Sequence, residues 1–201
     1  MRFFFGGKRD GIEGFLRWLR KQDGDIRSAH TIRPREPSYD GSGDLDPGIV
    51  EILNNRGIEK LWSHQSNAYR LASSGRDIVV VTPTASGKTF CYDIPVVDSI
   101  LRDPTGRALY LFPTKALAQD QLAELEELCS GLSVDIKSFT YDGDTPASRR
   151  KEIINSANIV ITNPDMLNTS ILPHHRSWAG FFSKLKFIVV DELHTYRGVF
   201  G

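Results

Sequence analysis

Residues 78–100 read IVVVTPTASGKTFCYDIPVVDSI. The apolar run at 78–81 predicts a buried strand, which is followed by a tight loop and then by a helix. Such a junction points backbone N–H groups into one concavity, and the helix dipole adds partial positive charge. It suits a triphosphate, with the Lys88 amine at the β- and γ-phosphates and the Thr89 hydroxyl on Mg²⁺. The residues predicted to bind the nucleotide here are Thr82, Pro83, Thr84, Ala85, Ser86, Gly87, Lys88 and Thr89.

Four more short apolar runs follow this stretch, and each of the first three is separated from the next by a helical or loop-helix segment. They lie at 109–112, 136–139, 159–162 and 187–190. Continuous apolar strands separated by helices predict a parallel sheet that is buried on both faces. Because crossovers between parallel strands are right-handed, the sheet is expected to be doubly wound. The predicted fold class is α/β.

Three helices are predicted with clear boundaries. One begins after the N-cap Asp46, with a proline in its first turn, and a second covers 63–75. The third covers 114–129, where apolar residues recur at helical spacing. Cys91 and Cys129 both fall in helical segments. Since two cysteines are too few for a disulfide framework, both are predicted to be reduced thiols in the core.

Two adjacent acids, Asp191 and Glu192, follow the last apolar run. Open α/β sheets bind ligands at the carboxyl ends of their strands. Neighbouring side chains on a strand point to opposite sides, so the two acids can take different roles. Asp191 is predicted to bind Mg²⁺, and Glu192 to orient and deprotonate the attacking water. Together with Lys88 they predict the catalytic residues of an NTPase that uses a nucleoside triphosphate and Mg²⁺.

Composition and charge exclude several classes of protein. The 201 residues include 25 Lys and Arg, 25 Asp and Glu, and 40% hydrophobic residues, which favours a soluble globular domain over a disordered chain. Zero net charge means that any nucleic-acid surface has to be local. No apolar run approaches the roughly 20 residues that span a bilayer. We therefore expect no membrane partner and a cytoplasmic location.

The chain is predicted to consist of an extension at 1–43 and a main domain at 44–201. The extension is rich in loop-forming residues and carries an excess of basic side chains. We interpret that excess as a solvated surface, with a nucleic-acid contact as the alternative. Farther along, His174 and His175 are interpreted as a surface loop rather than a metal site, and Trp178 as core packing rather than a base-stacking platform.

The motifs, in this order, resemble those of the superfamily 2 DExH-box helicases. DELH at 191–194 and PTASGKT at 83–89 match that signature, although a threonine replaces the first glycine of the general phosphate-loop pattern. LWSHQ at 61–65 resembles the glutamine motif, in which Gln65 reads the adenine edge. The resemblance also implies that His194 couples the γ-phosphate site to the nucleic-acid site or to a second motor lobe.

Further motifs resemble those that contact nucleic acid. PTKALAQDQ begins at 113, TYDGDT covers 140–145 and TNPDML covers 162–167. Their N–H groups, hydroxyls and lysine at one sheet edge suit phosphate contacts that read no base sequence, although each motif alone also suits ordinary helix capping. The predicted contacts are Pro113, Thr114, Lys115, Thr140, Gly143, Asn163, Pro164 and Asp165. Single-stranded or duplex DNA is the expected partner, and RNA stays open because such contacts serve both.

HTYRGVFG at 194–201 and HTIRPRE at 30–36 are similar to the mitomycin-repair-factor type of DNA helicase. This resemblance implies 3′ to 5′ DNA unwinding or translocation in DNA repair and a RecA-like sheet. It also implies a second RecA-like lobe, in cis or in trans, and a motif III strand between the phosphate-loop strand and the Asp-Glu strand. Because neither falls within 1–201, we expect an incomplete sheet with a gap at its centre.

Two alternatives stay open beside a strand-separating motor. One is a duplex translocase of the same superfamily, and the other is a nucleotide- or DNA-binding fragment without turnover. Hydrolysis in such motors draws on arginines from the opposite lobe, which are worth about 10³ to 10⁵ in rate. The isolated chain is therefore expected to bind ATP and Mg²⁺ weakly and to turn ATP over slowly.

Overall fold

The computed structural model describes residues 14–15, 17–18, 21, 38–41, 45–83 and 86–196. The chain separates into two compact units, residues 1–37 and 38–201. In the first unit, the rings of Phe15 and Trp18 stack with their centroids 6.1 Å apart. Thr84, Ala85, the motif at 30–36 and residues 197–201 lie outside the described residues. The predicted division into 1–43 and 44–201 remains a proposal.

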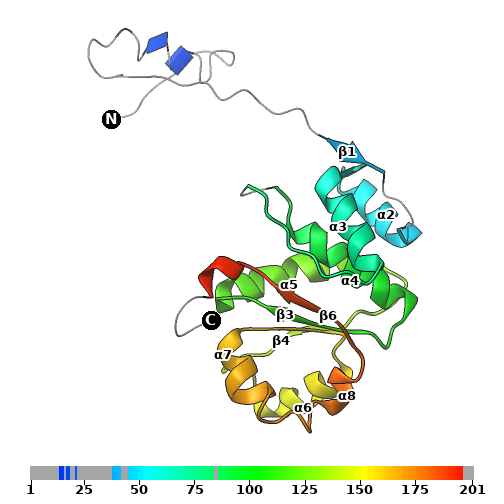
Figure 1. Ribbon diagram of the computed structural model, residues 1–201, viewed down its shortest axis with the longest axis vertical. Helices are drawn as coiled ribbons and strands as arrows, with labels where there is room; N and C mark the ends of the chain where they lie inside the picture. Colours follow the sequence, from blue (N-terminus) through cyan, green and yellow to red (C-terminus); the bar gives the residue numbers. More distant parts are fainter. Residues whose placement is uncertain are drawn as a thin grey trace. The chain divides into compact units, whose positions relative to one another are not determined.

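A parallel sheet of four strands organises the second unit (Figure 1). The strand order is β4-β5-β3-β6, so the chain crosses over between strands that are not consecutive in sequence. Helices cover both faces, with α4 and α5 on one side and α6, α7 and α8 on the other. The predicted α/β fold class is confirmed. The strands are β3 (Arg107–Leu111), β4 (Ser138–Thr140), β5 (Ile159–Thr162) and β6 (Leu185–Val190).

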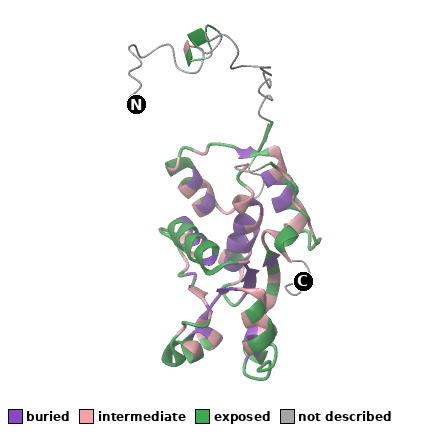
Figure 2. Ribbon diagram, turned by 90° about the vertical axis from the view of Figure 1, so that its left-hand side faces the viewer, coloured by how far each residue is buried: buried purple, intermediate pink, exposed green. Residues whose placement is uncertain are grey.

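Two hydrophobic clusters lie on opposite faces of this sheet. Side chains alternate along β3, so Ala108 and Tyr110 belong to the cluster with α4 and α5, whereas Leu109 and Leu111 belong to the cluster with α6 and α8. Figure 2 shows buried residues along the sheet and on the inner sides of the helices. The helices are α4 (Thr89–Arg102), α5 (Lys115–Cys129), α6 (Ala147–Ser156), α7 (Pro164–Met166) and α8 (Ala179–Phe182).

Two helices and a short antiparallel pair of strands precede the phosphate loop. Asp46 caps the first helix as predicted, because its Oδ1 accepts a hydrogen bond from the Gly48 N–H at 2.8 Å. The Asp46 N–H in turn donates to Asp98 Oδ1 of α4 at 3.0 Å, which ties the two helices together. These elements are β1 (Tyr39–Asp40), α2 (Pro47–Asn55), β2 (Leu61–Trp62) and α3 (Ser63–Ser73). Short turns complete the unit as η1 (Leu167–Ile171) and η2 (Leu193–Thr195).

The prediction of a buried strand at 78–81 is wrong for this chain. These residues have no strand structure, and Val79 and Val81 are 80% and 89% exposed. Within the described residues β6 pairs with β3 alone, and Ile188 on β6 is also exposed. A strand needs a hydrogen-bonded neighbour, and none of the described strands pairs with this segment. The apolar composition of this segment therefore does not predict its exposure in the structure.

The two cysteines differ in burial: Cys91 in α4 is buried, whereas Cys129 at the end of α5 is half-buried. Both thiols are free, and burial raises the pKa of Cys91 to about 11 and that of Cys129 to about 12. His174 and His175 are exposed, and the described residues contain no group of three metal-ligating side chains. Trp178 is 1% exposed and lies in the core. Over the described ranges, no helix is both long and apolar enough for a bilayer.

Candidate nucleotide and nucleic-acid sites

The phosphate loop leads directly into α4. Its two ends are joined by a contact of 2.5 Å between the Thr82 and Ser86 hydroxyl oxygens. Gly87 has a φ of +71°, in the left-handed region that favours glycine, and Lys88 follows as the N-cap of α4. Among the described residues, no hydrogen bond or ion pair holds the Lys88 amine. The amine is therefore available to a phosphate.

The first turn of α3 braces this loop from the side. Gln65 is 3% exposed; its Oε1 accepts from the Trp62 N–H at 3.0 Å, and its Nε2 donates to the Gly87 carbonyl at 2.9 Å. His64 Nε2 lies 2.9 Å from the Ser86 carbonyl oxygen. A Cβ on Gly87 would lie 2.6 Å from Gln65 Nε2. Residue 87 must therefore be glycine both for its backbone angle and for this brace.

An aromatic surface adjoins the brace, and sequence reasoning missed most of it. The rings of Tyr39 and Trp62 lie 5.2 Å apart, and those of Trp62 and His64 lie 6.3 Å apart. Tyr39 is 50% exposed and Trp62 is 42% exposed. The tryptophan inside LWSHQ was an available signal, but its pairing with Tyr39 depends on the antiparallel pairing of β1 with β2, which α2 separates in the sequence. Flat, exposed rings beside a phosphate loop can stack on a base.

The two acids lie just beyond the end of β6. The Asp191 N–H donates to the Leu111 carbonyl at 3.1 Å, and Asp191 Oδ1 accepts from the Glu192 N–H at 2.8 Å. Glu192 has a φ of 48°, rare for a non-glycine residue. The expectation that strand alternation separates the two side chains therefore does not apply, because the chain turns at this point. His194 Nδ1 lies 3.1 Å from Glu192 Oε2.

Tyr92 connects the first turn of α4 with Asp191 electrostatically. Burial raises its pKa far above the usual range, and the nearby Asp93 and Asp191 carboxylates raise it further. The pKa of Tyr196 rises to about 12 through burial and through Asp191 and Glu192. Within the described chain, no hydrogen bond or ion pair joins Lys88 to either acid. Asp191 nevertheless interacts electrostatically with Tyr92 on the helix that begins at the phosphate loop.

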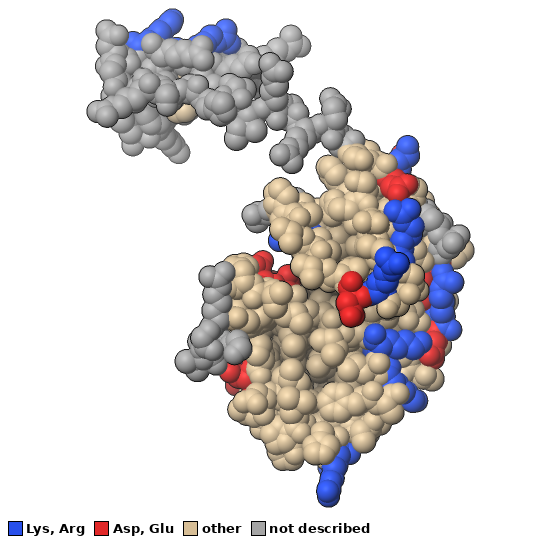
Figure 3. Space-filling view, in the orientation of Figure 1, with Lys and Arg blue, Asp and Glu red and all other residues tan. Residues whose placement is uncertain are grey.

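The residues at hand fit ATP and Mg²⁺. The Thr89 hydroxyl and the Asp191 carboxylate are hard oxygen donors, which Mg²⁺ prefers. Among the residues that the structure describes, the Lys88 amine has no hydrogen-bond or ion-pair partner, and the adjoining N-terminal end of α4 favours an anion. On the face shown in Figure 3, basic side chains gather along the right-hand edge of the second unit.

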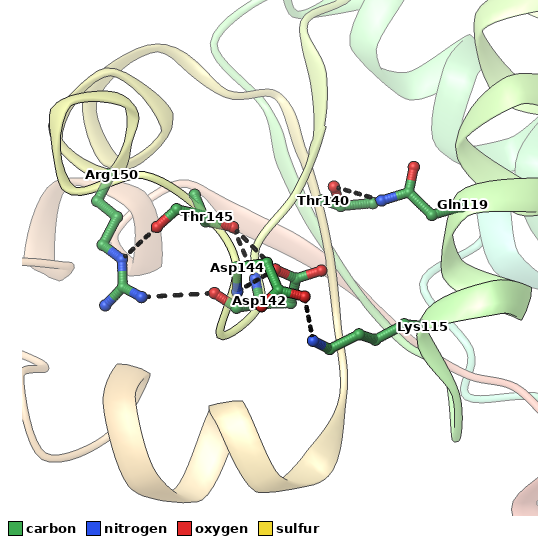
Figure 4. A network of polar contacts seen from close by, with 7 residues as sticks. All are labelled: Lys115, Gln119, Thr140, Asp142, Asp144, Thr145 and Arg150. Carbon is green, nitrogen blue, oxygen red and sulfur yellow. Dashed lines mark hydrogen bonds and ion pairs between the residues drawn. The ribbon is translucent and has the colours of Figure 1, made fainter.

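The predicted nucleic-acid residues fall into two groups. Thr114 Oγ1 caps α5 by accepting from the Leu117 N–H at 3.3 Å, and Asn163 Oδ1 caps α7 by accepting from the Met166 N–H at 2.9 Å. Both side chains thus perform ordinary helix capping. Lys115, in contrast, reaches across to the turn after β4 and contacts Asp144 (Figure 4). The predicted contacts at the start of α7, Asn163, Pro164 and Asp165, form the second group, the α7 group. None of the described hydrogen bonds or ion pairs joins the α7 group to Lys115.

A polar groove separates α5 from β4 and the start of α6. It encloses about 500 Å³, and Lys115, Gln119, Thr140 and Arg149 are among its lining residues. The Gln119 Nε2 donates to the Thr140 hydroxyl at 3.2 Å (Figure 4). Lys115 and Thr140 were predicted as contacts, whereas the acidic partner at 144 was not. The structure thus gathers part of the predicted contact set at one groove.

Comparison with known proteins identifies the family. The family model of the DEAD/DEAH box helicase matches residues 62–201. The ATP-dependent helicase YprA of Bacillus subtilis is 53% identical over 182 residues, 90% of this chain and 24% of that protein. The helicase hrq1 of Schizosaccharomyces pombe is 43% identical over 86% of this chain and 17% of its own length.

A solved structure agrees with these relatives. The crystal structure of the DUF1998 helicase MrfA bound to DNA and AMPPNP has a TM-score of 0.88 and 52% identity, covering 94% of this chain and 27% of that one. This chain spans about a quarter or less of the length of these three proteins. By fold, by the order of its motifs and by these matches, the chain belongs to the DEAD/DEAH box helicase family.

Proposed function

We propose that this chain is the ATP-binding motor lobe of a nucleic-acid helicase that unwinds or translocates along DNA in the 3′ to 5′ direction during repair. Residues 44–201 form the lobe and act with a second RecA-like lobe in the cytoplasm. The single observation that carries the proposal is the phosphate loop, which Gln65 braces at the N-terminus of α4. The relative YprA, whose name is that of an ATP-dependent helicase, and the structure of the helicase MrfA bound to DNA support the same assignment.

We propose the following roles in hydrolysis for the residues of the nucleotide site. Lys88 neutralises the β- and γ-phosphates, and backbone N–H groups of the loop hold the phosphate oxygens. Thr89 and Asp191 hold Mg²⁺, which when bound supplies charge neutralisation for the transferred phosphoryl group. Glu192 orients and deprotonates the attacking water. Its pairing with His194 at 3.1 Å supports a coupling role for that histidine.

The nucleic-acid site uses phosphate contacts rather than base contacts. The Lys115 amine, the Thr140 hydroxyl and the Gly143 backbone follow the carboxyl ends of β3 and β4, and the α7 group follows β5. Parallel strands bring these ends to one sheet edge, so a single strand can run across them. Such contacts serve DNA and RNA alike, and we propose DNA because the MrfA structure contains it.

Replacing Lys88 with alanine tests the nucleotide site. We expect the Lys88→Ala chain to bind a fluorescent ATP analogue with Mg²⁺ about ten-fold or more weakly, since one charge-assisted contact is lost. The control is Lys186→Ala, because Lys186 on β6 forms an exposed ion pair with Asp103. Fluorescence titration of both variants decides the matter. Equal affinity of Lys88→Ala and the wild type would reject the site.

Replacing Tyr39 tests the aromatic surface as the face that holds the base. We expect Tyr39→Ala to weaken ATP binding about ten-fold and to leave tripolyphosphate binding unchanged, because stacking is worth about 1–3 kcal/mol per base. Tyr39→Phe keeps the ring and is expected to bind like the wild type. Competition titrations with the two ligands measure both affinities. An equal loss for ATP and tripolyphosphate would contradict a contact with the base.

A further inference from the structure

The turn at 142–145 is held in one conformation by its own hydrogen bonds. The Asp144 N–H donates to Asp142 Oδ1 at 2.8 Å, and the Asp142 N–H donates to the Thr145 hydroxyl at 2.9 Å (Figure 4). Arg150 of α6 donates from Nε to the Thr145 carbonyl at 3.0 Å, and its guanidinium lies 5.4 Å from the centre of the Tyr141 ring. The backbone of Asp144 is therefore fixed, and its side chain takes no part in the turn.

The Asp144 side chain instead meets Lys115 at the groove between α5 and β4. The Lys115 Nζ lies 2.5 Å from Asp144 Oδ2 and joins the first turn of α5 to the turn after β4. The Lys115 side chain is 52% exposed and that of Asp144 is 83% exposed. The hydrogen bond to Asp144 raises the pKa of Lys115, so the amine stays charged. An ion pair this exposed is weak, which lets a stronger anion displace the carboxylate.

We infer that Lys115 exchanges partners when a nucleic-acid strand binds, with a phosphate replacing the Asp144 carboxylate, so that Asp144 limits the affinity of this surface. The inference rests on the proposed function, because it takes the Lys115 surface as a phosphate site. The released carboxylate stays near the incoming phosphate, since the turn at 142–145 fixes the Asp144 backbone that carries it. Two like charges then face each other, which opposes binding.

The exchange has a measurable consequence for salt dependence. A lysine that is free before binding releases a counterion from the phosphate it neutralises, and each such contact on a single strand adds about 0.7 to the slope of log affinity against log salt. When Lys115 leaves Asp144 for a phosphate, the freed carboxylate attracts a cation in return. The Lys115 contact therefore contributes almost nothing to the slope in the wild-type chain, although it contributes to binding.

The Asp144→Asn variant tests the partner exchange through both the affinity and the salt dependence of binding. The amide keeps the turn, because only the Asp144 N–H belongs to it, and it removes the competing charge. We expect the affinity for a fluorescent oligothymidylate at 50 mM NaCl to rise about five-fold and the salt slope to steepen by about 0.7. Lys115→Gln in the Asp144→Asn background is expected to cancel both gains. Anisotropy titrations of the 201-residue chain from 50 to 300 mM NaCl give both quantities.

The matched control is Asp135→Asn, which removes an exposed acid that precedes β4, at the end opposite the turn. We expect this variant to bind with the wild-type affinity and slope. If Asp144→Asn shows the same affinity and slope as Asp135→Asn, or binds more weakly than the wild type, the partner exchange is wrong while the helicase assignment stands. If no folded variant binds the oligonucleotide, the proposed nucleic-acid site and the exchange both fail.

Discussion

Trp178→Ala is expected to destabilise the chain by about 3–5 kcal/mol, as large-to-small substitutions of buried aromatic residues do. Trp178 is 1% exposed and lies at the centre of the cluster between the sheet and α8. Its ring meets Tyr141 edge-on at 5.0 Å and Phe181 edge-on at 5.5 Å. Alanine removes these contacts and leaves a cavity among large rings that cannot close over it.

Urea unfolding followed by far-UV circular dichroism measures this loss. Leu172→Ala is the control, since Leu172 is 49% exposed beside the same cluster and its truncation is expected to cost less than about 1 kcal/mol. Trp178→Phe is expected to fall between the two, because a smaller ring keeps part of the packing. A Trp178→Ala loss no greater than that of Leu172→Ala would mean that the cluster does not hold this side of the sheet together.

The features that the sequence predicted well are those that local pattern decides. The cap at Asp46 and the helix starting at Ser63 follow from residue types within a few positions. The strand at Ile159–Thr162 has the predicted bounds, and β4 starts two residues later than its apolar run. Trp178 was assigned to the core from its apolar neighbours, and the structure confirms this. In each case, residues that lie close together in the sequence are enough to predict the feature.

The features that the sequence missed depend on partners distant in the chain. The run at 78–81 has the composition of a buried strand, but its burial requires a neighbouring strand that the described residues do not supply. The geometry of Asp191 and Glu192 depends on a left-handed turn rather than on strand alternation. Lys115 was predicted as a phosphate contact, but its pairing with Asp144 comes from a turn 29 residues away.

The same contrast between local pattern and distant partners applies to the two candidate sites. The phosphate loop is readable because a glycine with positive φ and a helix N-terminus follow from adjacent residues. Its brace by Gln65, in contrast, joins segments 22 residues apart, so the motif indicated the glutamine but not its bond to the Gly87 carbonyl. The nucleic-acid motifs could not reveal that Thr114 and Asn163 cap helices, because capping and phosphate binding call for the same residue types.

The stability of the chain is expected to decrease as the pH rises from about 5 to 8, and Asp93→Asn is expected to remove most of this decrease. Asp93 is 1% exposed in α4, and burial raises its pKa from 3.8 to about 7. Hydrogen bonds from the Tyr110 hydroxyl at 3.0 Å and the Gln121 amide at 2.9 Å oppose that rise, whereas Glu124 and Asp191 add to it. Burial has the largest effect, so the folded chain favours the protonated carboxyl.

The sign of the pH effect follows from proton linkage. Because the pKa of Asp93 is higher in the folded than in the unfolded chain, its contribution is complete below pH 4 and is lost as the pH rises through about 7. The loss of unfolding free energy is on the order of 2–4 kcal/mol for a group so buried.

Urea unfolding at pH 5, 6.5 and 8 measures this loss, with Asp120→Asn on the exposed side of α5 as the control. Asparagine has no proton to lose and can still bridge Tyr110 and Gln121 if the Gln121 amide rotates, so the variant is expected to surpass the wild type at pH 8. Parallel pH profiles for the wild type, Asp93→Asn and Asp120→Asn would show that Asp93 is ionised throughout.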